Sequence, residues 1–97
     1  MEITLSTGQV TFDISDVRAT LAAALSREAV LARARRNAYE RACQEFEARF
    51  KITSEQFLAD FEAGMLGDDL AYFDWYAAKR GLDLWQQRTE ILSQVVV

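Results

Sequence analysis

The side chains of this chain that could do chemistry are few, and most of them are carboxylates. Asp68, Asp69 and Asp74 lie close together in the sequence. Such a group could bind Mg²⁺ or act as an acid–base pair. Asp68 and Asp69 also stand where a helix is predicted to begin, and there carboxylates cap free backbone amides and suit the helix dipole. We interpret the pair as a structural cap, with magnesium binding as the alternative.

The other side chains used in catalysis are nearly absent. The sequence of 97 residues has no histidine, which is the usual general base and the commonest metal ligand. Cys43, the one cysteine, falls on the apolar stripe of a predicted helix, where a core thiol is expected rather than a reactive one. Four glycines include no phosphate-binding loop. We therefore expect no catalytic residues, no metal site and no cofactor.

Composition indicates one globular domain over residues 1–97. The chain is 51% hydrophobic and 27% charged, which is typical neither of a disordered tail nor of a membrane protein. No apolar run approaches the roughly 18 residues that a membrane-spanning helix needs, and the N-terminus lacks the pattern of a secretory signal. We expect a cytoplasmic protein with no membrane association.

The apolar pattern predicts a mainly α-helical fold that starts with a short β-hairpin. Residues 1–14 alternate between apolar and polar, which is typical of two strands around a turn at Thr7 and Gly8. Residues 15–50 contain no glycine or proline and predict one long helix, capped by Ser15 or Asp16.

Two further helices are predicted in the second half of the chain, so that the helices form a hairpin or small bundle. Residues 53–63 start with a capping box of Thr53 and Gln56 and end at Gly64. Residues 68–93 form the third helix, and residues 94–97 could add a strand. The third helix carries two apolar stripes, more than one neighbour can cover. The stripes are Leu70, Phe73, Ala77, Leu84 and Ile91, and Trp75, Ala78, Leu82, Trp85, Thr89 and Leu92.

Charge is distributed unevenly along the chain, whose net charge is −4. The segment from Ile52 to Ala78 has six carboxylates and no basic residue. Such a surface repels nucleic acid and attracts a basic protein. A cluster of arginines on the long helix is interpreted as a solvated surface, with a DNA contact as the alternative. The carboxylates are Glu55, Asp60, Glu62, Asp68, Asp69 and Asp74, and the arginines are Arg33, Arg35, Arg36 and Arg41.

Residues 50–79 carry a motif with many fixed spacings. An aromatic residue precedes Thr53-Ser54-Glu55, and a Phe-Glu-x-Gly turn, Gly-Asp-Asp and an aromatic-x-Trp helix start follow. This third of the chain resembles a group of small prokaryotic antitoxin-like helical proteins, often paired with a small toxin. The resemblance implies an inhibitor of a toxin, although the matching residues are caps, turns and hydrophobic contacts.

The leading hypothesis is a non-enzymatic module that binds another protein, an antitoxin-like inhibitor of a small, basic, cytoplasmic toxin. The acidic segment would attract the partner, and exposed aromatic residues would anchor it. The alternative for these aromatic residues is the core. The predicted partner-binding residues are Glu55, Asp60, Glu62, Tyr72, Asp74, Trp75 and Tyr76.

The second hypothesis is a self-assembling helical adaptor or structural protein. Glu28 and Arg35 interrupt the apolar stripe of the long helix, either as side chains that reach solvent at its rim or as partners across a homodimer. An antiparallel pair of identical helices would set each of them against the other. The predicted self-association residues are Leu21, Leu25, Glu28, Ala32, Arg35, Tyr39 and Ala42.

Overall fold

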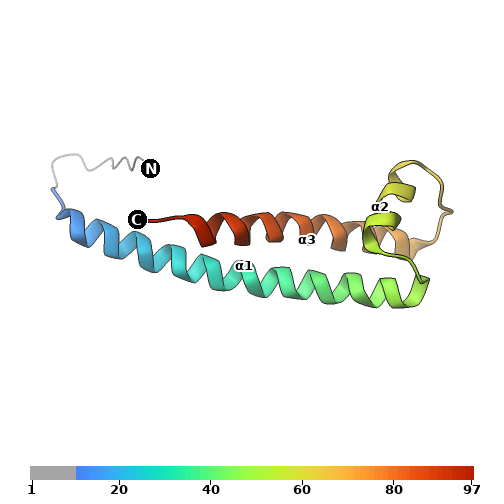
Figure 1. Ribbon diagram of the computed structural model, residues 1–97, viewed down its shortest axis with the longest axis horizontal. Coiled ribbons are helices and arrows are strands. Elements are labelled where there is room, and N and C mark those ends of the chain that lie inside the picture. The colour runs from blue at the N-terminus through green and yellow to red at the C-terminus, as the bar shows by residue number, and fades with distance from the viewer. Residues whose placement is uncertain (1–10) are drawn as a thin grey trace.

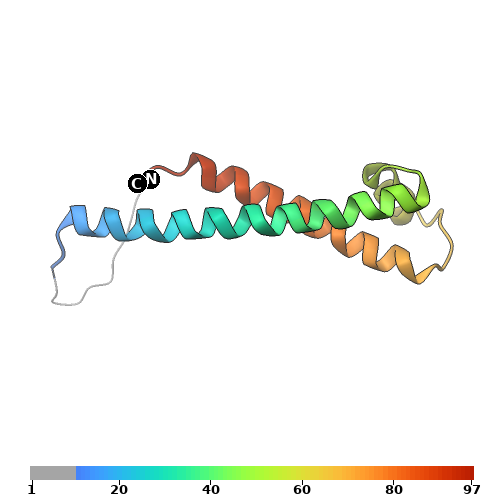
Figure 2. The same ribbon diagram turned by 90° about the horizontal axis from the view of Figure 1, so that it is seen from below.

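The structure, a computed structural model, describes residues 11–97 as three α-helices. Helix α1 spans Ile14–Phe50, α2 spans Ser54–Glu62 and α3 spans Leu70–Gln94. α1 and α3 lie antiparallel and side by side, and α2 packs at the end where α1 finishes and α3 starts (Figure 1, Figure 2). The molecule is elongated, with extents of 60 × 21 × 19 Å. The mainly helical part of the predicted fold is therefore confirmed.

The predicted N-terminal β-hairpin, by contrast, is wrong. Residues 1–10 of that prediction lie outside the described residues, but residues 11–13 form no strand and Ile14 already begins α1. Asp13 caps the helix in place of Ser15 or Asp16, because its carboxylate accepts a hydrogen bond of 2.8 Å from the Ser15 backbone N–H. No strand occurs anywhere in residues 11–97, so residues 94–97 add none.

Local signals explain where α1 ends and α2 begins. Lys51 adopts a left-handed conformation with φ of 64°, and its N–H donates to the Glu47 carbonyl at 2.9 Å. The predicted cap at Thr53 is confirmed, since its hydroxyl accepts a 3.1 Å hydrogen bond from the Gln56 N–H. The Gln56 side chain bonds to Asp60 instead of returning to Thr53, so only half of the capping box forms.

The turn between α2 and α3 follows the predicted signals. Gly64 has a φ of 70°, the left-handed conformation that glycine adopts freely after a helix. Asp69 is the N-cap of α3 and accepts a hydrogen bond of 2.9 Å from the Ala71 N–H. This contact supports the capping interpretation of Asp69. Within residues 11–97, no group of three or more acidic or cysteine side chains is arranged to hold a metal ion.

The second apolar stripe of α3, which contains Trp75, Ala78 and Trp85, faces α1. On α1 the facing side chains repeat with heptad spacing and include Ala32 and Cys43, both buried. The register is set where the Tyr39 ring lies against Gly81. Counting along both helices from this contact, α3 ends level with about Ser26 of α1.

One end of α1 therefore extends past α3, as Figure 1 shows at the blue end. We call residues 14–25 the α1 overhang. Its first apolar residue, Ile14, is 67% exposed, and Val17 and Leu21 are half-buried. In the described part of the chain, no helix has the length and apolar character needed to cross a membrane.

Candidate protein-interaction surface

A cluster of aromatic rings fastens α2 to the two long helices. Trp75 is fully buried and stacks on Phe57 with ring centroids 4.0 Å apart. Phe46 and Phe50 of α1 stack on the same indole at 5.7 and 5.5 Å. The prediction of Trp75 as an exposed anchor is wrong, because its position in the stripe with Ala78 turns it toward α1.

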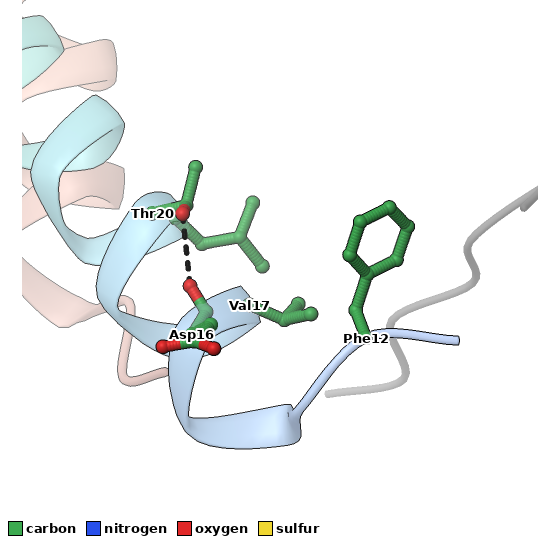
Figure 3. Close-up of a pocket in the computed structure, with 5 residues that line it drawn as sticks. Phe12, Asp16, Val17 and Thr20 are labelled. Atoms are coloured by element: carbon green, nitrogen blue, oxygen red, sulfur yellow. Dashed lines mark hydrogen bonds between the residues drawn. The ribbon is translucent and has the colours of Figure 1, made fainter. Parts of the chain in front are cut away.

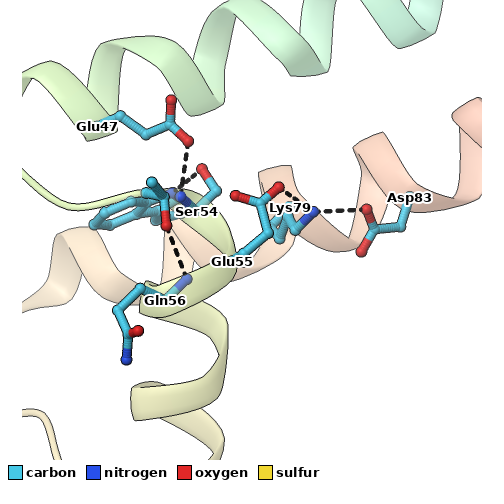
Figure 4. Close-up of polar contacts among 8 residues, drawn as sticks. Glu47, Ser54, Glu55, Gln56, Lys79 and Asp83 are labelled. Carbon is cyan, nitrogen blue, oxygen red and sulfur yellow. Dashed lines mark hydrogen bonds and ion pairs between the residues drawn. The ribbon is translucent and has the colours of Figure 1, made fainter.

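A short chain of buried hydrogen bonds completes this core (Figure 4). The Trp75 indole N–H donates to the Ser54 hydroxyl at 3.0 Å, and Ser54 is 1% exposed. The Ser54 backbone N–H donates to the Glu47 carboxylate at 2.7 Å. Each helix thus supplies one member, and the start of α2 is fixed against α1 and α3. Sequence reasoning missed Ser54 and Glu47, since a serine after a cap residue looks like part of the cap.

Lys79 is the second polar group at this junction, and its side chain is 9% exposed. Its ammonium lies 2.9 Å from Asp83 and 3.4 Å from Glu55. Burial by itself lowers the pKa of Lys79, but the hydrogen bond and charge of Asp83, together with those of Glu55, raise it above 10.5. The pKa of Glu55 is lowered below 4.5, mainly by a backbone hydrogen bond at the start of α2. Lys79 therefore keeps its positive charge at neutral pH, and the carboxylates of Asp83 and Glu55 balance that charge.

Aromatic side chains reach the surface on the side of this core that carries α2. Phe61 lies 5.0 Å from Tyr76 and 5.8 Å from Phe73, measured between ring centroids. Tyr72 packs against Phe50 at 5.3 Å. Phe73 is 60% exposed, whereas Phe61, Tyr72 and Tyr76 are half-buried. The predicted anchors Tyr72 and Tyr76 are thus in one partly exposed cluster, to which the structure adds Phe61 and Phe73.

Carboxylates surround this cluster. Glu62, Asp68, Asp69 and Asp74 are exposed, and half-buried Asp60 accepts a hydrogen bond of 2.8 Å from Gln56. In residues 11–97 the ion pairs are those that Lys79 makes, so of the six carboxylates only Glu55 is paired. We call this surface, with its aromatic cluster, the acidic end. It brings together the predicted residues Glu55, Asp60, Glu62, Tyr72, Asp74 and Tyr76.

A second surface is a groove between α1 and α3. The groove has a volume of about 270 Å³ and is lined by Glu28 of α1 and by residues of α3 that include Arg88 and Ile91. Beside it the Trp85 ring has the guanidinium of Arg35 at 4.6 Å and that of Arg88 at 4.7 Å. Both arginines and Glu28 are exposed. We call this side of the hairpin the groove face.

The predicted self-association residues divide between the two sides of α1. Ala32 is fully buried, and Tyr39 covers Gly81, so these two contact α3 of the same chain and leave the predicted set. The reason is that the line of α1 residues facing α3, which we call the seam, includes Ala29 and Arg36. Each of these follows Glu28 or Arg35 by one residue. Outside the seam, Glu28 and Arg35 are exposed, whereas Leu21, Leu25 and Ala42 are half-buried.

A third feature is an apolar hollow on the α1 overhang (Figure 3). Its volume is about 250 Å³, and Phe12, Val17 and Leu21 line it together with Asp16 and Thr20. The Thr20 hydroxyl donates to the Asp16 carbonyl at 2.8 Å, so this polar group is already satisfied by its own helix. The hollow therefore offers apolar contact and little else.

Comparison of the chain with protein-family profiles, with curated proteins and with solved structures finds no match. The antitoxin-like resemblance of residues 50–79 accordingly stays a prediction.

Proposed function

We propose that this chain is a non-enzymatic protein-binding module that uses its acidic end to bind a small basic protein. The observation that carries the proposal is a partly exposed aromatic cluster surrounded by carboxylates. Phe73, a member of the cluster, is 60% exposed, and Met65 in the turn after α2 is 74% exposed. Two lysines flank the acidic segment in the sequence: Lys79 is paired with Glu55 and Asp83, whereas exposed Lys51 at the end of α1 makes no ion pair within residues 11–97.

This arrangement suits a protein better than it suits a small molecule or nucleic acid. Interfaces combine an apolar centre, rich in aromatic residues, with a polar rim. Unpaired carboxylates around the centre repel phosphate backbones and speed the approach of a positively charged protein. The partner that fits has apolar side chains flanked by Lys and Arg.

The resemblance of residues 50–79 gives this module its proposed role as an antitoxin-like inhibitor of a small cytoplasmic toxin. The acidic end would occupy the basic surface with which such a toxin binds its own substrate. The adjacent open reading frame supplies the first candidate partner, and we expect it to encode a small basic protein. A neighbouring product without basic character would leave the module without its toxin partner.

Calorimetric titration of the full chain with that basic protein tests the proposed surface. We expect Phe73→Ala to weaken binding about tenfold or more. Glu62→Lys should also weaken binding, and its effect should be larger at low salt than at high salt. Glu90→Lys, at an exposed position near the C-terminal end of α3 and far from the acidic end, serves as the control. Affinity that is independent of salt and of both changes would show that the acidic end is not the binding surface.

A second candidate function, a self-assembling helical adaptor, is favoured by the other apolar stripe of α3. Leu84 and Ile91 are 42% and 54% exposed although α3 already buries one stripe against α1. A homodimer would cover them. Sedimentation equilibrium at two protein concentrations separates the candidates, since a monomer at both concentrations excludes self-assembly and leaves the acidic end as the functional surface.

A further inference from the structure

The groove face exposes apolar side chains from both long helices. On α3, Leu84 and Ile91 are partly exposed, and Ile91 lines the groove together with Glu28 of α1. Leu31 follows Glu28 by one helical turn, on the same side of α1, and is 39% exposed. Apolar residues of α1 and α3 therefore share one long face with no neighbour in the described part of the chain.

Two charges of α1 stand on this face and make no ion pair within residues 11–97. They are Glu28 and Arg35, which are two helical turns apart and therefore too distant to form an ion pair with each other. Arg35 is held in place because its guanidinium lies over the Trp85 ring. A guanidinium stacked in this way keeps the N–H groups at its edge available for a carboxylate. Arg35 is thus positioned for an acidic partner from outside the chain.

We propose that a second copy of this chain covers the groove face, with the two α1 helices antiparallel and Glu28 of each copy paired with Arg35 of the other. This inference rests on the self-assembling function above and adds its register. The same register sets Leu21 opposite Ala42 of the second copy. A two-fold axis beside Leu31 then matches both charges twice.

Helix lengths favour this register over others. The point midway between Glu28 and Arg35 is also the middle of α1, Ile14–Phe50, so the two α1 helices overlap over their full lengths. A parallel pair in register would set Glu28 against Glu28 and Arg35 against Arg35. That arrangement juxtaposes like charges and is disfavoured.

The register also covers the α1 overhang. Because α3 ends level with about Ser26, the overhang of one copy lies level with the first half of α3 in the second copy. Within residues 11–97 both surfaces are exposed: Phe12 just before the overhang and Ile14 in it are 57% and 67% exposed, and Leu70 is 80% exposed. The dimer thus brings the hollow on the overhang beside the exposed start of the other copy's α3.

Two single variants of the full chain test the charge pairing by sedimentation. In a homodimer of Glu28→Arg, arginine faces arginine, and in one of Arg35→Glu, glutamate faces glutamate. We expect each variant alone to dimerise at least about tenfold more weakly than the wild type. An equimolar mixture should recover dimerisation, because every facing pair is then of opposite charge. Glu40→Arg, an exposed position of α1, is the matched control and should leave the dimer unchanged.

Disulfide trapping provides a readout that does not depend on charge. Leu31→Cys lies beside the proposed two-fold axis and should link two copies on oxidation, whereas Val30→Cys on the neighbouring side of α1 should not. The native Cys43 is 2% exposed, and burial raises the pKa of its thiol, so it does not compete.

The outcomes separate this register from self-assembly in general. A wild type that stays monomeric at high concentration overturns both. A dimer that survives either single charge change, or that is trapped through Val30→Cys but not through Leu31→Cys, overturns the register alone and leaves self-assembly standing. Circular dichroism of each variant shows whether the helices remain folded, and recovery in the mixture cannot come from unfolded chains.

Discussion

The ring of Tyr39 lies against the backbone of Gly81, so closely that a Cβ at position 81 would be 2.6 Å from Tyr39 Cε1. Glycine inside a helix normally costs about 1 kcal/mol relative to alanine. At this position it allows α1 and α3 to approach, and the apparent weak point of α3 is a packing contact between the two long helices.

Gly81→Ala is therefore expected to lower the free energy of unfolding by about 1–3 kcal/mol, the typical cost of overpacking, instead of raising it. In a Tyr39→Ala background the same change should be stabilising by about 1 kcal/mol, because the clash is gone and the helix propensity of alanine remains. Urea unfolding of the four proteins gives this double-mutant cycle. Stabilisation by Gly81→Ala in the presence of Tyr39 would contradict the contact.

Ser54→Ala tests the buried hydrogen bond to Trp75. The change leaves the indole N–H without its acceptor in the core, which should cost about 1–3 kcal/mol in the free energy of unfolding. Ser93→Ala is the matched control, since the Ser93 hydroxyl donates to the Glu90 carbonyl in an exposed part of α3. If the two variants lose the same free energy of unfolding, the buried hydrogen bond contributes no more to stability than the exposed one.

Asp69 and Asp68 should respond differently to alanine. Asp69 caps α3, so Asp69→Ala should cost about 1 kcal/mol, and Asp69→Asn less because asparagine also caps. Exposed Asp68 makes no such hydrogen bond within residues 11–97, and Asp68→Ala should change stability by less than about 0.5 kcal/mol. Thermal unfolding with and without Mg²⁺ checks this, and a magnesium-dependent Tm that both substitutions remove would restore the metal interpretation.

The shifted pKa values of Lys79 and Glu55 predict a stability that depends on pH at both extremes. The raised pKa of Lys79 means that its contribution is complete below pH 10.5 and is lost as the pH rises through the folded-state value. The lowered pKa of Glu55 means that its contribution is present above pH 4.5 and is lost as the pH falls through its folded-state value.

Lys79→Met separates these two effects in urea titrations across pH. The variant keeps the buried packing of the side-chain stem, so its difference from the wild type at pH 7 should be small, about 1 kcal/mol or less. That difference should shrink as the pH rises from 10.5 through the raised folded-state pKa of Lys79. Most of the loss in acid should persist in the variant, because a backbone hydrogen bond, more than Lys79, lowers the pKa of Glu55. An acid loss abolished by Lys79→Met would assign the effect to the ion pair instead.

The helices could be predicted because their signals are local. A run without glycine or proline marks α1, the Thr53 cap marks α2, and Gly64 marks its end. The hairpin prediction failed for the opposite reason, since alternation of apolar residues depends on a distant surface to bury them. Asp13 caps α1, so Ile14 belongs to the helix and not to the predicted strand.

The acidic end could be located from the sequence, but its aromatic anchors could not be assigned. Both stripes of α3 are apolar, and nothing local shows which of them faces α1. Trp75 is buried because it meets Phe57 and the Ser54 hydroxyl, residues that only the folded chain brings near it. The same limit applies to α1, where a shift of one residue in the seam moved Glu28 and Arg35 from the apolar stripe to the surface.

The elongated shape of the antiparallel pair of helices, α1 and α3, governs how the molecule rotates in water. A body of 60 × 21 × 19 Å turns slowly end over end and quickly about its long axis. The backbone N–H bonds of α1 and α3 lie nearly along that axis, so the nuclear relaxation of their nitrogens reports the slow end-over-end rotation. A mass inferred from that relaxation is therefore above the true 11.0 kDa. An antiparallel dimer that overlaps along α1 thickens the rod more than it lengthens it. Rotation about the long axis, rather than end-over-end tumbling, therefore slows most when two copies associate.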